Sequence, residues 1–364
     1  MSGVQSRARA IFAAYPELVA VLAAAILGLS VQRLAWLAAH QGINVLLAIL
    51  VFATAVTIDP AALRRLAQAW RSLLAAVAVG ITVLPALSWA VSRIVTAGSL
   101  RDGVMAVGLA PCEIASVATT AMAGGEAAVS AGVLIGSTVA AVALAGPILT
   151  LEAGHAGVSP GGIISNLALV VALPLALGLA ARATAEAPAR ATAEAPARAS
   201  AQAPARASAQ APTVNVRAPR PARLLAATRI LATARAERIA SWTSLAAVAA
   251  LVALIAAEIR LSAAYLAVAA ALLLFLAGSA LVGRALGARA ARPTATALLL
   301  TTSMRDFAIA AGLAAAAFGP AAAAPLGLYG VAVLVWGTAV AGALRQRVAR
   351  AEPGGPPSEL GATR

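Results

Sequence analysis

The chain has 364 residues, of which 62% are hydrophobic and only 11% are charged. A soluble domain carries roughly 25% charged residues, so the composition excludes an ordinary soluble enzyme or binding domain. The apolar residues gather in windows of about 20, the length of a helix that crosses a hydrocarbon core of roughly 30 Å. The sequence therefore indicates an all-α membrane protein with several spans.

The formal net charge is +14, and every Lys or Arg position is Arg. In a soluble protein this balance would suggest nucleic acid as a partner. Beside apolar spans, Arg instead sets the orientation in the membrane, so we expect a lipid bilayer and no nucleic acid. Cys112 is the single cysteine, which excludes an internal disulfide and a multi-cysteine zinc site. We expect no cofactor and no metal centre.

Hydropathy predicts ten membrane spans, with both ends of the chain outside the apolar region. The spans are about 18–37, 43–58, 72–92, 103–122, 127–149, 161–181, 241–257, 262–283, 295–317 and 322–343. Spans 1 to 6 fill the segment 1–181, with a first five-span unit at 18–149. Spans 7 to 10 fill 241–343, and 344–364 is a tail.

The arginines test the orientation. With the N-terminus inside, 22 of them lie in cytoplasmic segments, and four lie in outer loops, namely Arg33, Arg93, Arg101 and Arg260. Without the segment 182–240 the ratio is still 12 to four. Because positive loops stay in the cytoplasm, we predict a multi-pass protein of the inner (plasma) membrane with both termini cytoplasmic.

Residues 181–212 are four near-copies of an eight-residue word that ends in Pro. Proline breaks helices, and the word has no large apolar residue with which to build a core. We predict a cytoplasmic low-complexity linker over 182–240 that acts as a spacer. The alternative is that its arginines bind anionic lipid headgroups.

Three charged residues lie inside predicted spans: Glu113 in span 4, and Arg305 and Asp306 in span 9. Charges in a membrane are rare and costly, so each is a candidate for the substrate site. Pro111 is expected to break span 4. In span 9, the hydroxyls of Thr301, Thr302 and Ser303 could bond unwound backbone.

Spans 4 and 9 occupy equivalent positions if spans 1 to 5 and 6 to 10 are two copies of one unit. An odd number of spans in each copy forces the copies into opposite orientations. Inverted repeats with a broken helix in each half are typical of secondary transporters, whose site lies at the midplane. We therefore predict ten helices in two inverted five-helix repeats.

Several pieces carry a family resemblance: NVLLAILVFATAVTIDP, LPALSWAVSR, PCEIASVATT, AVSAGVLIGSTVAAVALAGPIL and TTSMRDFAIA. By their order and spacing, the chain resembles the bile acid:sodium symporter family and its arsenite-exporter relatives over nearly all ten spans. The resemblance implies a panel domain and a core domain, in which spans 4 and 9 cross at their breaks. It also implies secondary transport of a small organic anion.

The resemblance further implies where sodium ligands would stand, and most of them are replaced. The family's Ser-Asn pair in span 4 corresponds here to Ser116 and Val117, and its two span 5 hydroxyls correspond to Ser130 and Leu134. Its span 9 Glu and Gln correspond to Thr301 and Arg305, and its span 3 Gln corresponds to Gly80. Ser116, Ser130 and Thr301 remain as residual ion ligands. A hard cation needs several oxygen ligands, and a guanidinium repels it, so the sequence argues against sodium coupling.

The role of Arg305 has three readings. It pairs with Glu113, it pairs with Asp306, or it holds a substrate anion through a bidentate contact. We expect Arg305 to pair with Glu113 when no substrate is bound. Because Glu113 is protonatable, the coupling ion could be H⁺ as well as Na⁺.

Cys112 has two readings as well. A lone cysteine in a packed helix is usually a small buried hydrophobe. The piece GLAPC, however, resembles span 4 of arsenite exporters, where a thiol suits a thiophilic metalloid, so metalloid export through Cys112 is the second hypothesis. A non-transporting receptor or scaffold is the third. The predicted spans lack a nucleophile with a base, so we expect no enzyme.

Overall fold

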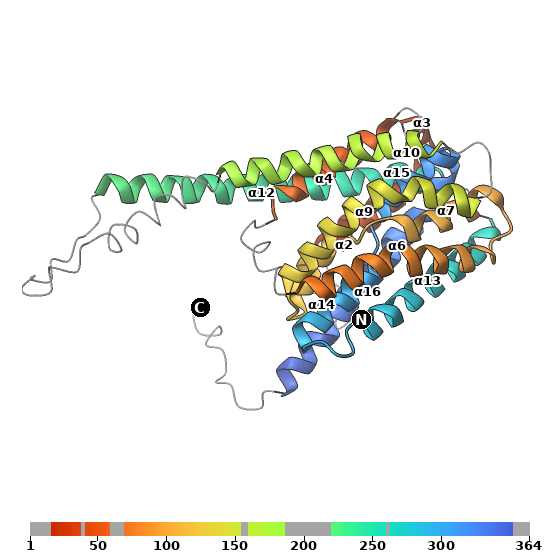
Figure 1. Cartoon of the computed structure of the whole chain (residues 1–364). Helices are drawn as coiled ribbons and strands as arrows, with labels where there is room; N and C mark the ends of the chain where they lie inside the picture. Colours follow the sequence, from red (N-terminus) through yellow and green to blue (C-terminus); the bar gives the residue numbers. More distant parts are fainter. Residues whose placement is uncertain are drawn as a thin grey trace, which may run out of the picture.

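The computed structural model describes residues 16–37, 41–58, 69–153, 159–185, 220–259 and 262–351, and the structural statements below concern these ranges. Their regular elements are all helical (Figure 1). In chain order they are α2 (Pro16–Ser30), η1 (Gln32–Leu34), α3 (Ala35–Leu37), α4 (Ile43–Ala55), α6 (Trp70–Ser92), α7 (Gly98–Leu109), α8 (Ala115–Met122), α9 (Ala127–Ala153), α10 (Pro160–Leu167), the π-helical η4 (Ala168–Ala172), α12 (Arg220–Ala257), α13 (Ala264–Leu286), α14 (Arg292–Ser303), α15 (Phe307–Phe318), η5 (Pro320–Ala323) and α16 (Ala324–Ala351).

Six helical stretches in the described ranges are long and apolar enough to cross a membrane. They are Trp70–Ser92, Ala127–Glu152, Pro160–Ala185, Arg238–Ala257, Ala264–Leu286 and Pro320–Arg347. They coincide with predicted spans 3, 5, 6, 7, 8 and 10. Shorter apolar helices lie at Val19–Ser30, Ile43–Ala55 and Phe307–Phe318, so the prediction of a multi-pass helical membrane protein is confirmed.

Large apolar side chains cover much of the outer surface. Leu266 is 77% exposed, Leu281 is 68% exposed, and Ile26 and Trp242 are each 65% exposed. In water such a surface would drive aggregation. In a bilayer the same side chains face lipid tails, which solvate them.

The predicted linker is shorter at both ends than 182–240. The helix that begins with α10 continues to Ala185, and α12 begins at Arg220 and runs without a break into predicted span 7. The extension of α12 is rich in Ala, Leu and Arg, the residues with the highest helix propensity. Most of the eight-residue repeat lies outside the described residues.

The helices fall into two neighbourhoods. In one, α2 and α4 pack on α12, and the Oγ atoms of Thr54 and Ser244 are 3.2 Å apart across the contact between α4 and α12. In the other, α6 packs on α7, α9 and α13, and α13 packs on α14. Figure 1 shows α4, α10 and α12 along one side and α13, α14 and α16 along the other.

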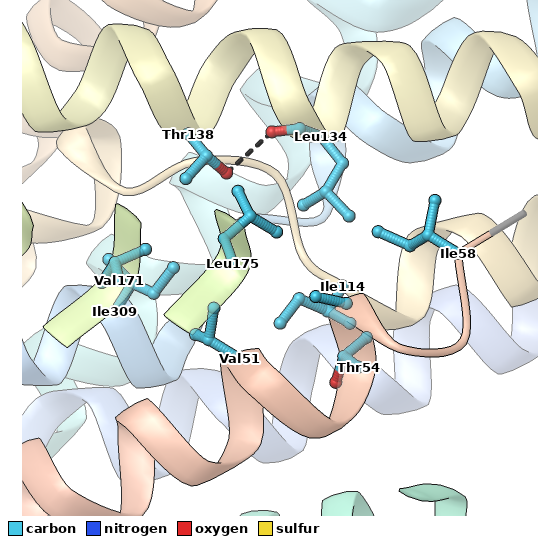
Figure 2. A pocket seen from close by; sticks show the side chains of 10 residues that line it. Val51, Thr54, Ile58, Ile114, Leu134, Thr138, Val171, Leu175 and Ile309 are labelled. Atoms are coloured by element: carbon cyan, nitrogen blue, oxygen red, sulfur yellow. Dashed lines mark hydrogen bonds between the residues drawn. The ribbon is translucent and has the colours of Figure 1, made fainter. Parts of the chain in front are cut away.

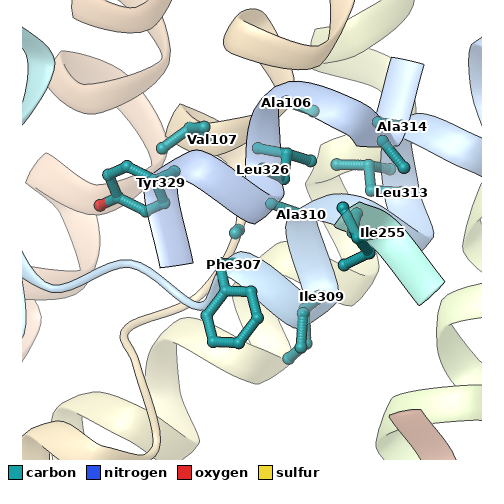
Figure 3. Packing of buried hydrophobic residues seen from close by; sticks show 14 of the residues in the cluster. Ala106, Val107, Ile255, Phe307, Ile309, Ala310, Leu313, Ala314, Leu326 and Tyr329 are labelled. Atoms are coloured by element: carbon teal, nitrogen blue, oxygen red, sulfur yellow. The ribbon is translucent and has the colours of Figure 1, made fainter. Parts of the chain in front are cut away.

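Buried side chains join the broken helices to α16. Phe307, Leu313 and Tyr329 are at most 1% exposed, and Figure 3 shows them in one cluster with Ala106 and Ile255. The rings of Tyr329 and Phe275 meet edge to face with their centroids 6.1 Å apart. This packing fixes the start of α15, where the charged residues lie.

Candidate functional site

Predicted spans 4 and 9 are each split into two helices. In span 4, α7 ends at Leu109 and α8 begins at Ala115. Pro111 lacks an N–H group and disfavours helical backbone at the residue before it, and Ala110 is extended, with φ −66° and ψ 150°. The break predicted at Pro111 is thus present.

The break in span 9 contains no proline. Helix α14 ends at Ser303 and α15 begins at Phe307, and the flanking residues Met304 and Asp306 have extended backbone, with ψ of 105° and 104°. Asp306 starts the second helix because its side chain accepts hydrogen bonds from the N–H groups of Ala308 at 2.9 Å and Ile309 at 2.8 Å. Asp is among the preferred residues at this capping position.

The two breaks, residues 110–114 and 304–306, pair with each other through their backbones and together form the crossing. Glu113 N donates to Met304 O at 2.8 Å, and Asp306 N donates to Pro111 O at 2.9 Å. Cys112 and Arg305 face each other as an antiparallel bridge between these bonds. The pairing satisfies backbone groups that would otherwise be unbonded where no water reaches them, and it brings four of the predicted site residues together.

Extended pairing also sorts these side chains onto two faces. Successive side chains in a strand-like segment point to opposite sides. Cys112 and Arg305 therefore share one face, and Glu113 and Asp306 share the other. The charges of Glu113 and Asp306 act directly on each other.

Both carboxyl groups lie at helix N-termini. The Glu113 carboxyl group lies close to the backbone N–H groups of Phe307, Ala115 and Ile114, at the starts of α15 and α8. Asp306 caps α15. The N-terminus of a helix carries a partial positive charge, so each carboxylate stands where a helix favours a negative group.

The Arg305 side chain makes no hydrogen bond to the free oxygen of either acid. Its Nη2 donates to the carbonyl oxygen of Ala110, at the end of α7, where the helix dipole is negative. On its other side lies Gly80 of α6, and a Cβ at Gly80 would be 3.4 Å from Nη1. The guanidinium thus fills space that a side chain at position 80 would take.

The ion pair expected between Arg305 and Glu113 is absent from this structure. Glu113 Oε2 has no hydrogen-bond partner, and neither has Asp306 Oδ2. The reason is the antiparallel pairing, which places Arg305 on the face opposite Glu113. The sequence does not show that the two breaks are extended and paired, so it does not predict which face each side chain takes.

The span 9 hydroxyls bond mainly within their own helix instead of serving unwound backbone. Thr301 Oγ1 donates to Ala297 O at 2.8 Å, and Ser303 Oγ donates to Leu299 O at 2.8 Å. Ser303 also accepts from Trp336 Nε1 at 3.1 Å. Thr302 Oγ1 has no partner and its Cβ lies close to Gly283 of α13.

The residual ion ligands are fully buried. Ser116 Oγ donates to Cys112 Sγ at 3.9 Å, and Ser130 Oγ accepts from Thr120 Oγ1 at 3.3 Å. Thr301 bonds its own helix, as described above. Each of these hydroxyls already has a protein partner.

Cys112 is packed as a small apolar residue. It is 0% exposed, its N–H donates to Ser137 Oγ at 3.1 Å, and its side chain lies in a buried cluster that includes Ala76, Val133 and Leu298. The thiol shares its face of the crossing with Arg305.

A pocket lies beside the crossing. Figure 2 shows Ile114 and Ile309, which lie at the starts of α8 and α15, facing side chains of α4, α9 and the helix that begins with α10. The lining residues are Val51, Thr54, Ala55, Ile58, Ile114, Leu134, Thr138, Val171, Leu175 and Ile309. This pocket cannot be predicted from the sequence, because its apolar lining residues have the same pattern as core residues.

Even the polar members of the lining offer few free groups. Thr54 Oγ1 donates to Leu50 O at 2.8 Å, and Thr138 Oγ1 donates to Leu134 O at 2.7 Å. The pocket therefore has an apolar wall that includes Ile114 and Ile309, at the starts of the two half-helices α8 and α15.

Helices that break inside the apolar region and pair there are typical of membrane transporters. The sequence profile of the Sodium Bile acid symporter family matches residues 44–194, which include the first break. The match supports the resemblance seen in the motifs: residues 44–194 are similar to this family, whose members are transporters and not enzymes. The search of curated proteins finds no match.

Proposed function

We propose that the protein is a secondary transporter that moves a small organic anion by alternating access and has no sodium coupling. The observation that carries the proposal is the place of Arg305. Its guanidinium is buried against Gly80, and the resemblance implies sodium ligands at both positions. A fixed positive charge there repels a sodium ion and attracts an anion.

The alternating-access mechanism is supported by the likeness of the two halves. Helices α6 and α13 each have 23 residues, and α7 and α14 each have 12. The hydrogen bond from Glu113 N to Met304 O has its counterpart in that from Asp306 N to Pro111 O. Such correspondence fits inverted repeats around a fixed site, with a core that contains the crossing and a panel that contains α2, α4 and α12.

The pocket suggests the kind of anion. Its wall is apolar, as the walls of most small-molecule sites are. A carboxylate or sulfonate with an apolar body matches such a wall. The apolar body would lie in the pocket, and the charged group would point to the crossing.

A thermal-shift titration of the purified protein tests the proposal. NaCl is compared with choline chloride at equal ionic strength, and then carboxylates, sulfonated bile acids and arsenite are added. We expect no sodium effect and stabilisation by an anion that disappears in Arg305→Ala. A stabilisation specific to sodium would contradict the absence of sodium coupling.

The same titration separates anion transport from metalloid export. Cys112→Ser keeps a small side chain, so it should leave the anion response unchanged. If arsenite stabilises the protein and Cys112→Ser abolishes that effect, the metalloid function replaces the one proposed here. If no ligand class binds, the receptor or scaffold hypothesis gains support.

A further inference from the structure

The charges at the crossing do not balance. Arg305 contributes one positive charge, and Glu113 and Asp306 contribute two negative charges when both are ionised, which leaves one uncompensated negative charge. Burial makes that costly: Glu113 is 6% exposed, Asp306 is 0% exposed and Arg305 is 3% exposed. An unbalanced charge in such a place is normally neutralised by a proton or a cation.

The two acids also have free acceptor positions. Asp306 Oδ1 accepts from two backbone N–H groups, whereas Glu113 Oε2 and Asp306 Oδ2 are buried and have no hydrogen-bond partner. Buried carboxylate oxygens are rarely left unbonded. Two of them on the same face of one crossing indicate a site for a small positive species.

The remaining groups around the pair do not supply that species. Arg305 and Cys112 lie on the opposite face of the extended pairing, and Arg305 donates to Ala110 O. From α16, the hydroxyl of Tyr329 accepts from Arg305 N at 3.3 Å and is 3.4 Å from Ser303 O. Within the described chain, no basic side chain hydrogen-bonds either free oxygen, although the charge of Arg305 acts on Asp306.

We propose that Glu113 and Asp306 share one exchangeable proton, and that this proton is the coupling ion of the transporter. One carboxylate takes a proton from the water on one side of the membrane and then donates it to the other acid's free oxygen as a hydrogen bond. Two like-charged acids in contact titrate as a pair, so the proton belongs to both. The crossing then has zero net charge.

The inference rests on the proposed function for its meaning in transport. With the pair ionised, its uncompensated charge repels an anion at the neighbouring pocket. With the proton bound, that repulsion ends while Arg305 stays positive. Proton and anion therefore favour each other's binding, and the coupling is reciprocal.

Infrared difference spectroscopy of the protein in lipid nanodiscs tests the site directly, without substrate. Protonation of a buried carboxylate produces a carboxylic C=O band that can be followed through a pH titration in choline chloride. We expect one such band in the unaltered protein. It should be lost in Glu113→Gln and also in Asp306→Asn, because the single remaining carboxylate is balanced by Arg305 and stays ionised.

Glu126→Gln is the matched control. Glu126 lies beyond the far end of α8 and accepts a hydrogen bond from Thr294 Oγ1 at 2.8 Å, so its substitution should leave the band unchanged. A band that survives either Glu113→Gln or Asp306→Asn would overturn the shared proton. So would the absence of any titrating band in the unaltered protein.

A sodium titration completes the test. If NaCl removes the band at constant pH, the pair binds sodium instead, and the proton proposal is wrong. Failure of anion transport would leave all these spectra as expected, so the proton site and the transport function can fail independently.

Discussion

At the scale of single residues, the crossing is organised by helix ends. Each of its charged side chains is opposite in sign to the helix end that it meets: Asp306 and Glu113 at N-termini, and Arg305 at the end of α7. Charges that looked like a ligand-binding triad in the sequence thus also hold the half-helices in place. Their structural contribution can be measured separately from transport.

Asp306→Ala should destabilise the protein by about 0.5–2 kcal/mol, because it removes the oxygen that caps α15. Asp306→Asn keeps a capping oxygen and should cost much less. Thermal unfolding of the two variants in the same detergent checks this prediction. Equal losses in both would mean that the negative charge, and not the cap, stabilises the start of α15.

Gly80 should tolerate Ala but not Leu. A Cβ would lie 3.4 Å from Arg305 Nη1, which is an ordinary contact, whereas a leucine would push the guanidinium away from Ala110. We expect a lower unfolding temperature for Gly80→Leu than for Gly80→Ala.

A double substitution provides the control for this contact. In Arg305→Ala the leucine has room, so the two changes together should cost less than the sum of their separate effects. Strict additivity would show that position 80 and Arg305 do not interact.

At the scale of elements, the helices and breaks follow from the sequence, but the contacts between them do not. Apolar windows located the six long spans, and Pro111 located the break in span 4. The second break could be placed only by its polar residues, since Met304 and Asp306 are extended without a proline. Arg305 and Glu113 were expected to pair because both are charged, whereas the backbone pairing of the two breaks, a long-range contact, decides which face each side chain takes.

The contact between α6 and α7 depends on a missing side chain. A Cβ on Gly108 would lie 2.6 Å from the carbonyl oxygen of Leu84 and closer still to Ser88 Oγ, which itself donates to Met105 O at 3.0 Å. Gly108→Ala should therefore cost about 1–3 kcal/mol through overpacking. Thermal unfolding measures the loss.

Gly98 in the same helix is the matched control, because nothing lies within 4 Å of a Cβ placed there. Gly98→Ala should be neutral or slightly stabilising, since alanine has the higher helix propensity. A similar loss in both variants would show that α7 is sensitive to alanine in general and not to this contact.

At the scale of the whole molecule, the charge distribution predicts orientation. The excess of arginine on one set of loops predicts that both termini lie in the cytoplasm. A fluorescent protein fused to either end should therefore fluoresce, and alkaline phosphatase fused to either end should be inactive. Active phosphatase at one end would require an odd number of spans.

The eight-residue repeat should be dispensable. Deletion of residues 183–212 should leave the unfolding temperature and the ligand response unchanged, because the repeat interrupts the spans without adding apolar surface. A scrambled sequence of equal composition is the control for length. If deletion abolishes ligand response but the scrambled linker restores it, the linker acts through its length.

The backbone pairing of the two breaks has a mechanical consequence. Its hydrogen bonds lie where water is scarce, so separating α7–α8 from α14–α15 would leave several groups unbonded at a cost of several kcal/mol each. The crossing should therefore travel as a rigid body. The apolar wall of the pocket can slide without breaking such bonds. We therefore expect α4 to move relative to the paired half-helices during transport. The ion and the substrate would move together with the half-helices that hold the acids.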